Sequence, residues 1–259
     1  MCGIVGILGK GPVAEQLVDS LKRLEYRGYD SAGVATLEGV QLDRRRAKGK
    51  LKNLEAVLKT SPLEGHIGIG HTRWATHGKP TETNAHPHAT DRVAVVHNGI
   101  IENFRELRAK LESEGATFSS ETDTEVVAHL VNSFLAKGMK PVDAVKATLP
   151  LLHGAFALAF IFEGEDNLMI GARKGSPLAV GYGEGEMYLG SDAIALGPFT
   201  DTISYLDDGD WVVLSRSDAT VYDDKNAVVE REIVRHSTAS ALVDKANYRH
   251  FMAKEIHEQ

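Results

Sequence analysis

Short apolar runs dominate the second half of the chain, and this pattern constrains the fold more than any other feature. Strands are predicted over residues 156–162, 168–172, 178–181, 187–191, 203–206, 211–214 and 220–222. Several of these runs are separated by only a few residues, which is typical of hairpins. We therefore expect mostly antiparallel sheets in this half of the chain.

Helical patterns lie between sets of strands in the first half. Apolar residues recur at helical spacing after Pro12, at positions 13, 17, 21 and 24, and Gly28 ends this pattern. Further helices are predicted over 51–58, 102–114, 122–137 and 141–152, and strands over 2–8, 34–37, 67–74 and 93–97. Helices grouped between strands favour an α+β fold, in which helices cover antiparallel sheets.

Composition narrows the class of protein. A chain of 259 residues that is 42% hydrophobic and 25% charged can bury a substantial core in one large or two small domains. Its single cysteine, Cys2, excludes an internal disulfide and a multi-cysteine metal site. The net charge of -7 disfavours nucleic acid or an anionic membrane as the main partner. Without a basic leader or a long apolar run, we expect a cytoplasmic protein.

Two polar clusters are weak candidates for ligand sites. The basic run contains Arg44, Arg45, Arg46, Lys48, Lys50 and Lys52. It is interpreted as a solvated turn and helix start, because nothing nearby supports the alternative of a phosphate site. His86 and His88 could suggest a metal pair, but Pro87 separates them and no third ligand is evident. We predict neither a metal nor a cofactor.

Cys2 is the residue whose position suggests chemistry. Removal of Met1 would place a thiol and a free α-amine on one residue, with ordinary pKa values of about 8.5 and about 8. Such an amine can serve as general base for the thiol, as in N-terminal threonine enzymes. The alternative is an inert cysteine that packs beside an apolar strand.

Three further motifs could supply the groups that an attacking thiol needs. Asn98 and Gly99, at the end of a predicted strand, offer an amide and an approachable backbone N–H for an oxyanion, although Asn-Gly is more often a hairpin turn. Arg73 suits a substrate carboxylate, and Trp74 has the bulk to cover a site; the alternative is a strand end with a surface arginine. Asp123 could hold a substrate ammonium or could cap a helix.

Six segments together resemble the glutaminase domain of the glucosamine-6-phosphate synthase family, also called isomerising glutamine–fructose-6-phosphate aminotransferases. They are CGIVGI (2–7), RLEYRGYDSAG (23–33), HTRWATHG (71–78), NAHPH (84–88), HNGIIEN (97–103) and ETDTE (121–125). The resemblance extends from Cys2 to at least Asp210. It implies a four-layer αββα sandwich of two antiparallel sheets flanked by helices, of the N-terminal-nucleophile hydrolase type.

The same resemblance implies a domain division. Residues 1–238 would form a type 2 glutamine amidotransferase domain, and residues 239–259 would begin a linker. The segment YRHFMAKEIHEQ (248–259) also resembles the sequence that leads into the second half of the family enzymes. In those enzymes two sugar isomerase domains follow.

Roles for the catalytic motifs follow from the resemblance. Cys2 would be the nucleophile and its α-amine the general base, while Asn98 and Gly99 would form the oxyanion hole. Arg27 and His86 would support the site. The expected reaction is hydrolysis of L-glutamine to glutamate and ammonia through a γ-glutamyl thioester on Cys2.

Roles for the binding motifs follow in the same way. Arg73 would bind the glutamine α-carboxylate and Asp123 its α-ammonium, with Thr76 and His77 lining the pocket. Trp74 would belong to a mobile loop that closes over glutamine. In a full-length homodimeric enzyme, the ammonia would convert fructose-6-phosphate to glucosamine-6-phosphate for amino-sugar synthesis.

Two other functions stay open from the sequence. The first is an N-terminal hydrolase of another amide, such as a peptide, and activity on substrates without an α-carboxylate would favour it. The second is a non-catalytic module that senses glutamine or assembles with partners. Retention of Met1 would favour this module, because the α-amine would then not lie on Cys2.

Overall fold

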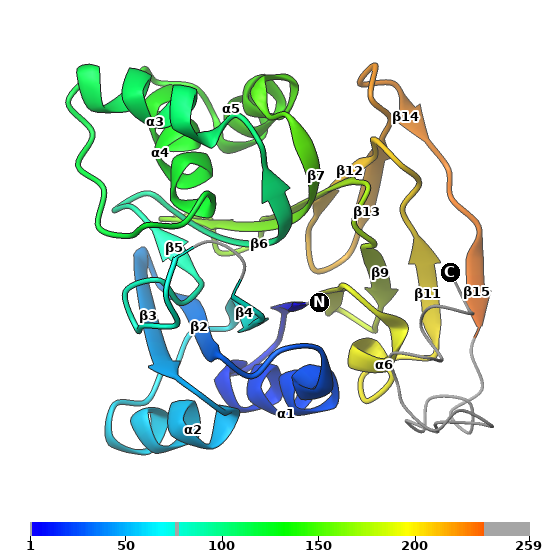
Figure 1. Cartoon of the computed structure of the whole chain (residues 1–259). Helices are drawn as coiled ribbons and strands as arrows, with labels where there is room; N and C mark the ends of the chain where they lie inside the picture. Colours follow the sequence, from blue (N-terminus) through cyan, green and yellow to red (C-terminus); the bar gives the residue numbers. More distant parts are fainter. Residues whose placement is uncertain (1, 76–77, 236–259) are drawn as a thin grey trace, which may run out of the picture.

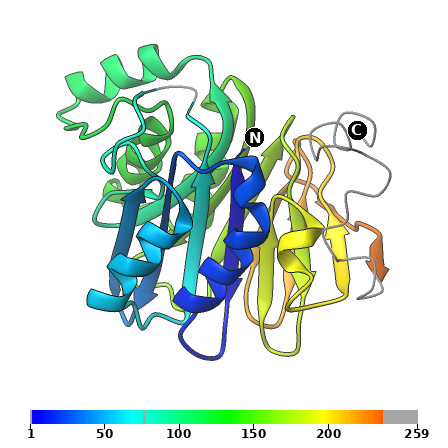
Figure 2. The ribbon, with the colours of Figure 1, turned by 60° about the horizontal axis from the view of Figure 1, so that its bottom comes forward.

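The computed structural model describes residues 2–75 and 78–235, which form four layers. Two antiparallel sheets face each other, and helices cover both outer faces (Figures 1 and 2). This arrangement confirms the predicted αββα sandwich. Within the described residues, no helix is both long enough and apolar enough to cross a lipid bilayer.

The first sheet is built around the amino-terminal strand. In the described part of the chain, eight strands pair in the order β15 (Ile233–Arg235), β11 (Thr202–Tyr205), β9 (Ala179–Tyr182), β10 (Met187–Gly190), β1 (Gly3–Leu8), β4 (Ile67–Arg73), β2 (Ser31–Glu38) and β3 (Gln41–Lys48). Figure 1 shows the start of the chain near the middle of the molecule, and Cys2 directly precedes β1, which lies between β10 and β4.

The second sheet carries the Asn-Gly motif. Seven described strands pair in the order β14 (Val228–Val229), β13 (Ala219–Tyr222), β12 (Trp211–Leu214), β8 (Met169–Lys174), β7 (Gly154–Phe162), β6 (Val93–Ile101) and β5 (His88–Ala89). The strands of both sheets pair antiparallel to their neighbours.

Helices cover each sheet on the side away from the other. The first sheet is covered by α1 (Ala14–Leu24), α2 (Leu51–Thr60) and α6 (Ala193–Leu196), and a 3₁₀ turn, Glu25–Arg27, follows α1. Figure 2 shows α1 and α2 lying across that sheet. The second sheet is covered by α3 (Phe104–Ser113), α4 (Thr124–Ala136) and α5 (Pro141–Thr148), and the 3₁₀ turn Leu149–Leu151 follows α5.

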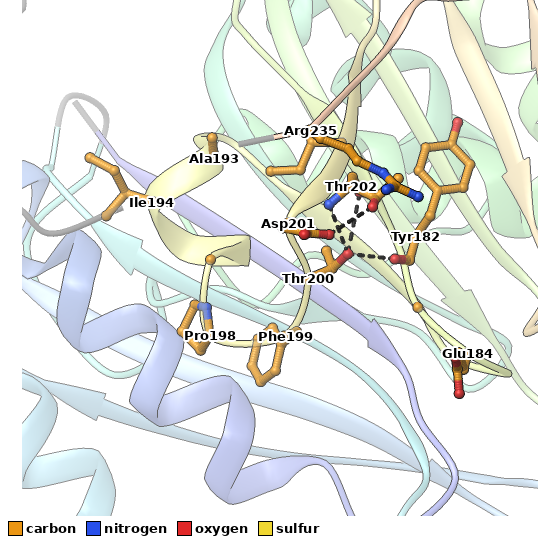
Figure 3. Close-up of a pocket in the computed structure, with 13 residues that line it drawn as sticks. Tyr182, Glu184, Ala193, Ile194, Pro198, Phe199, Thr200, Asp201, Thr202 and Arg235 are labelled. Carbon is orange, nitrogen blue, oxygen red and sulfur yellow. Dashed lines mark hydrogen bonds between the residues drawn. The ribbon is translucent and has the colours of Figure 1, made fainter. Parts of the chain in front are cut away.

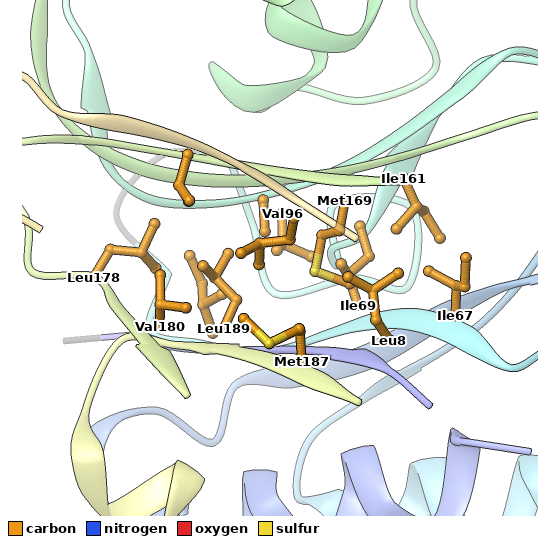
Figure 4. Close-up of a cluster of buried hydrophobic side chains, with 14 of the residues drawn as sticks. Leu8, Ile67, Ile69, Val96, Ile161, Met169, Leu178, Val180, Met187 and Leu189 are labelled. Carbon is orange, nitrogen blue, oxygen red and sulfur yellow. The ribbon is translucent and has the colours of Figure 1, made fainter. Parts of the chain in front are cut away.

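Alternation along β1 explains how this strand serves two cores at once. Leu8 points into the apolar layer between the sheets (Figure 4) and Ile4 belongs to the same buried cluster, whereas Val5 and Ile7 pack in the cluster that contains α1. Successive side chains of a strand face opposite sides, so the even-numbered residues of β1 face the second sheet.

The first four residues of the basic run lie in a strand, so their interpretation as a solvated turn is wrong, whereas Lys50 and Lys52 lie at the start of α2 as expected. Residues 41–48 form β3, the edge strand beside β2. The Arg44 guanidinium donates to the Pro87 carbonyl at 3.1 Å, and that of Arg46 donates to the Ala85 carbonyl at 3.0 Å. These arginines bond the loop before β5 to the sheet edge, so they have a structural use and the phosphate alternative gains no support.

Candidate active site

Cys2 precedes β1 and is half-buried. Its Sγ accepts a hydrogen bond from the Trp74 backbone N–H at 3.2 Å and lies 3.5 Å from the Trp74 carbonyl oxygen. Within the described residues, no imidazole or carboxylate is hydrogen bonded to this sulfur. Burial raises the pKa of the Cys2 thiol, against the lowering effect of the Trp74 N–H. A neutral thiol needs a base before it can attack, and in the part of the chain that the structure describes no side chain is hydrogen bonded to the sulfur as such a base.

Asn98 lies directly beside Cys2, although the two residues are far apart in the sequence. It belongs to β6, and its Nδ2 donates to the Cys2 carbonyl oxygen at 3.1 Å. The Nδ2 of Asn98 carries two N–H bonds, and the contact with the Cys2 carbonyl uses one of them. The second N–H can therefore be donated to another acceptor near Cys2. The contact joins the central strand of the first sheet to the second sheet, and it brings two of the predicted catalytic residues together.

Gly99 is inside a strand rather than in a turn. The hairpin-turn alternative and the predicted strand end at residue 97 are both wrong, because β6 continues to Ile101 and pairs with β7. Gly99 has φ of 116°, a conformation that side chains rarely adopt. A Cβ atom here would lie 2.0 Å from the Ala155 carbonyl oxygen. Only glycine fits at this point of the ladder.

Arg73 is the last residue of β4 and is 3% exposed, so the alternative of a surface arginine is wrong. Its guanidinium donates to the carbonyl oxygens of Gly78 and Lys79 at 3.3 and 3.4 Å. Burial lowers its pKa, while Cys2 and the Asp123 carboxylate act in the opposite direction. A buried guanidinium close to the thiol can bind a substrate carboxylate.

Asp123 occupies the N-cap position of α4, but its side chain makes no capping hydrogen bond to the helix. Its Oδ2 instead accepts the Ile101 backbone N–H at 2.8 Å, two residues beyond Gly99. The residue is 6% exposed. The carboxylate is therefore directed to the end of β6, where it can meet a cation in the site.

The RGYD segment holds the backbone around Arg73 and Trp74. Asp30 Oδ2 accepts the Ala75 N–H at 2.8 Å, and the rings of Tyr29 and Trp74 meet edge to face at 5.8 Å. A Cβ atom on Gly28 would lie 2.7 Å from the Arg73 carbonyl carbon. The sequence analysis did not predict this contact of Asp30. Its only signal there was that Asp30 lies in one of the six segments that resemble the family.

Arg27 and His86, which were predicted to support the site, form hydrogen bonds to residues other than Cys2 and Asn98 in the part of the chain that the structure describes. Arg27 forms an ion pair with Asp192, which caps α6. The Oγ of the adjacent Ser191 accepts a hydrogen bond from the Ile4 backbone N–H at 3.0 Å, so the segment before α6 is bonded to β1. His86 contacts Thr124 Oγ1 through Nε2 at 2.7 Å. The predicted pocket residues Thr76 and His77 lie outside the described residues.

Buried histidines form a polar layer beneath Asn98. They are His71, His86, His88 and His97, and each is at most 5% exposed. Burial lowers the pKa of His71 and of His88 to about 3, and it lowers that of His86 well below its usual range. These three rings are therefore neutral at neutral pH. In the portion of the chain that the structure describes, no three ligand-type side chains are grouped to hold a metal ion.

A cavity of about 620 Å³ lies away from these residues. Its walls come from β9, α6, β11 and the loop between α6 and β11, and Thr200 is hydrogen bonded to Tyr182 within it (Figure 3). Of the predicted catalytic and binding residues that the structure describes, none lines this cavity. The candidate site is instead the junction of Cys2, Arg73, Asn98 and Asp123 at the ends of β1, β4 and β6.

Comparisons with known sequences agree with the predicted family. A family model described as a glutamine amidotransferase domain matches residues 71–198. The chain is 74%, 67% and 60% identical over 259 residues to proteins named glutamine–fructose-6-phosphate aminotransferase (isomerizing) from Bradyrhizobium diazoefficiens, Brucella suis and Caulobacter vibrioides. Each alignment covers 100% of this chain and 43% of the relative, so the chain spans less than half the length of these relatives.

Solved structures support the same fold. The glutamine phosphoribosylpyrophosphate amidotransferase of B. subtilis, complexed with ADP and GMP, is similar with a TM-score of 0.74 at 24% identity, over 88% of this chain and 50% of that chain. A structure described as the allosteric regulatory enzyme of purine biosynthesis is similar with a TM-score of 0.70 at 26% identity, over 91% of this chain and 49% of that chain.

Proposed function

The chain belongs to the glutamine amidotransferase domain family, and from that premise we propose that it hydrolyses L-glutamine to glutamate and ammonia with Cys2 as nucleophile. The observation that carries this proposal is the hydrogen bond from Asn98 Nδ2 to the Cys2 carbonyl oxygen. It brings a strong amide donor to the residue that bears the only thiol of the chain. A nucleophile beside an oxyanion donor is the minimum arrangement for acyl transfer.

The proposed reaction has two halves. The Cys2 sulfur attacks the side-chain amide carbon, and the carbonyl oxygen becomes an oxyanion that Asn98 Nδ2 and the Gly99 N–H stabilise. The C–N bond then breaks as the nitrogen takes the proton that the α-amine of Cys2 removed from the thiol, so ammonia leaves. Water next attacks the γ-glutamyl thioester, which releases glutamate and restores the thiol. The α-amine can act only after Met1 has been removed.

Charge complementarity favours a free amino acid as substrate. Glutamine carries an α-carboxylate and an α-ammonium, and the site offers a buried guanidinium at Arg73 and a buried carboxylate at Asp123. If Arg73 binds the α-carboxylate and Asp123 binds the α-ammonium, both charged groups of glutamine are fixed, and its side-chain amide is held at a defined position in the site. Thr76 and His77 are proposed to line the same pocket, and Trp74, 45% exposed, is proposed to cover it. Arg27 and His86 are proposed to support it.

The wider proposal concerns the full-length protein. Residues 1–238 would form the amidotransferase domain and residues 239–259 the start of a linker to sugar isomerase domains. The relatives are more than twice as long as the stretch that this chain matches, 43% of each, and so have room for such further domains. In such a protein, the ammonia would convert fructose-6-phosphate to glucosamine-6-phosphate, in a cytoplasmic homodimer.

Intact mass spectrometry after incubation with an electrophilic glutamine analogue tests the proposal. We expect protein without Met1 that carries one adduct, located on Cys2, and we expect excess glutamine to prevent its formation. Protein that keeps Met1, takes up no analogue and releases no ammonia would favour the non-catalytic module. Ammonia release from amides that lack an α-carboxylate, at the rate seen with glutamine, would favour the general amide hydrolase.

Arg73→Ala is expected to raise KM for glutamine by roughly 10-fold to 100-fold with a smaller effect on kcat, because a charge-assisted contact to the substrate carboxylate is lost. The comparison substrate is 4-aminobutanamide, which is glutamine without its carboxylate. The wild type should strongly prefer glutamine over this compound, and the variant should lose most of that preference. An unchanged KM would remove Arg73 from carboxylate binding.

A further inference from the structure

His71 contacts Asn98 from the opposite sheet and is not part of the mechanism above. It lies in β4, fully buried, and its Nε2 is 3.0 Å from Asn98 Oδ1 and 2.9 Å from the His97 carbonyl oxygen. Its ring also packs on that of His86, with centroids 4.1 Å apart. Asn98 is thus held on one side by His71 and on the other by the Cys2 carbonyl.

The tautomer of His71 follows from its partners. A backbone carbonyl oxygen can only accept a hydrogen bond, so Nε2 must carry the proton that points to His97. The ring is neutral, because burial lowers the pKa of His71 to about 3. Nδ1 is therefore the nitrogen without a proton, and within the described residues it has no hydrogen-bond partner. The proton on Nε2 is shared between the His97 carbonyl and Asn98 Oδ1.

This tautomer determines which way the Asn98 amide faces. With Nε2–H on one side and the Cys2 carbonyl oxygen on the other, Oδ1 must face His71 and Nδ2 must face Cys2. The flipped amide would place its NH₂ group against the Nε2–H and its oxygen against the Cys2 oxygen. Both contacts would then be repulsive, in a buried setting where unsatisfied polar groups are strongly unfavourable.

We propose that His71 is a positioning residue, which holds the Asn98 amide with its N–H groups turned toward the thiol-bearing residue and so preorganises the oxyanion donor. The proposal rests on the proposed function, in which Asn98 stabilises the oxyanion. Preorganisation of such a donor matters because a donor that must reorient during the reaction loses much of its effect. His71 acts through Asn98, which its Nε2 contacts, rather than through the substrate or the sulfur.

Two substitutions of His71 in the full chain separate the effect of its Nε2–H donor from the effect of the space that its ring fills. His71→Met fills similar space without a donor, whereas His71→Gln places an amide N–H near the position of Nε2. We expect His71→Met to lower kcat by about 10-fold to 100-fold, with KM for glutamine changed less than about threefold. His71→Gln should recover most of kcat. Alkylation of Cys2 by iodoacetamide, which forms no oxyanion, should proceed at the wild-type rate in both variants.

A double-mutant cycle with Asn98→Ala tests whether His71 affects kcat through Asn98. If His71 acts through Asn98, His71→Met should cause no further loss of kcat in the Asn98→Ala background. Multiplicative losses would overturn the proposal, since His71 would then act independently of the amide. His88→Met is the matched control, because His88 is equally buried in the same layer and bonds Thr122 rather than Asn98. It should keep kcat within about twofold.

The role of His71 and the oxyanion role of Asn98 can fail separately. A His71→Met variant with wild-type kcat, beside an Asn98→Ala variant that has lost activity, would overturn only the role of His71. Wild-type turnover in Asn98→Ala would overturn the oxyanion assignment itself. If both His71 variants fail to fold, nitrogen-15 spectroscopy of the wild-type imidazole decides. The proposal requires the Nε2–H tautomer, and observation of the Nδ1–H tautomer would contradict it.

Discussion

Cys2→Ala is expected to abolish glutamine hydrolysis, with kcat lowered by at least about 10⁴-fold, while the domain stays folded. The chain has no second cysteine that could replace this nucleophile. Alanine keeps the Cβ atom and removes only a half-buried sulfur at the start of β1, so packing changes little. Ammonia release and the thermal unfolding midpoint, measured on the same preparation, check both parts of this expectation.

Two companion variants identify the base. Cys2→Ser should be nearly as inactive as Cys2→Ala, because a hydroxyl is harder to deprotonate than a thiol. A chain with an uncleaved residue ahead of Cys2 keeps the thiol but blocks the α-amine. It should react with iodoacetamide yet release little ammonia. Full glutaminase activity in that blocked chain would exclude the α-amine as the base. Because the pKa of the Cys2 thiol is raised, another group would then have to deprotonate it.

The elements with strong periodicity were predicted well from the sequence. Val13, Leu17, Leu21 and Leu24 recur on one face, and all four are buried where α1 meets the first sheet. The helix has 11 residues, enough for the spacing to be distinctive. Four short elements were not predicted, although other strands of four residues were. The strands β5, β14 and β15 have two or three residues each and lack a distinct apolar run, and the helix α6 has four residues, too few to show a helical period.

The missed strand β3 shows where local patterns mislead. Its consecutive arginines carry no alternation of apolar and polar residues, so the run looked solvated. What makes it a strand is pairing with β2 and the bonds from Arg44 and Arg46 to a loop about forty residues away. Such long-range partners are not visible in a local window.

Asn98 and Gly99 show the same limit at the site. The dipeptide favours a turn, but pairing of β6 with β7 continues through it to Ile101. Family resemblance pointed to the residues that meet at Cys2, yet it did not predict the contact between His71 and Asn98. That contact depends on how two sheets pack face to face, which sequence separation does not reveal.

Asn98→Ala is expected to lower kcat by roughly 10²–10³-fold, the usual effect of losing one oxyanion donor. KM should change little, because the donor acts mainly on charge that develops in the transition state. The fold should persist, since alanine is compatible with β6 opposite Ala157 and His71 keeps its bond to the His97 carbonyl. Unfolding midpoint and Cys2 alkylation rate are the controls, and kcat within about threefold of wild type would contradict the assignment.

Asn98→Asp makes this prediction sharper, because it keeps the shape of the side chain and changes only its chemistry. One carboxylate oxygen would still accept from His71, but the other would face the Cys2 carbonyl oxygen as an acceptor against an acceptor. A negative charge would also stand where the oxyanion forms. Asn98→Asp should therefore be less active than Asn98→Ala, although it is closer in shape to the wild type. The reverse order would mean that Asn98 serves the site by filling space rather than by donating a hydrogen bond.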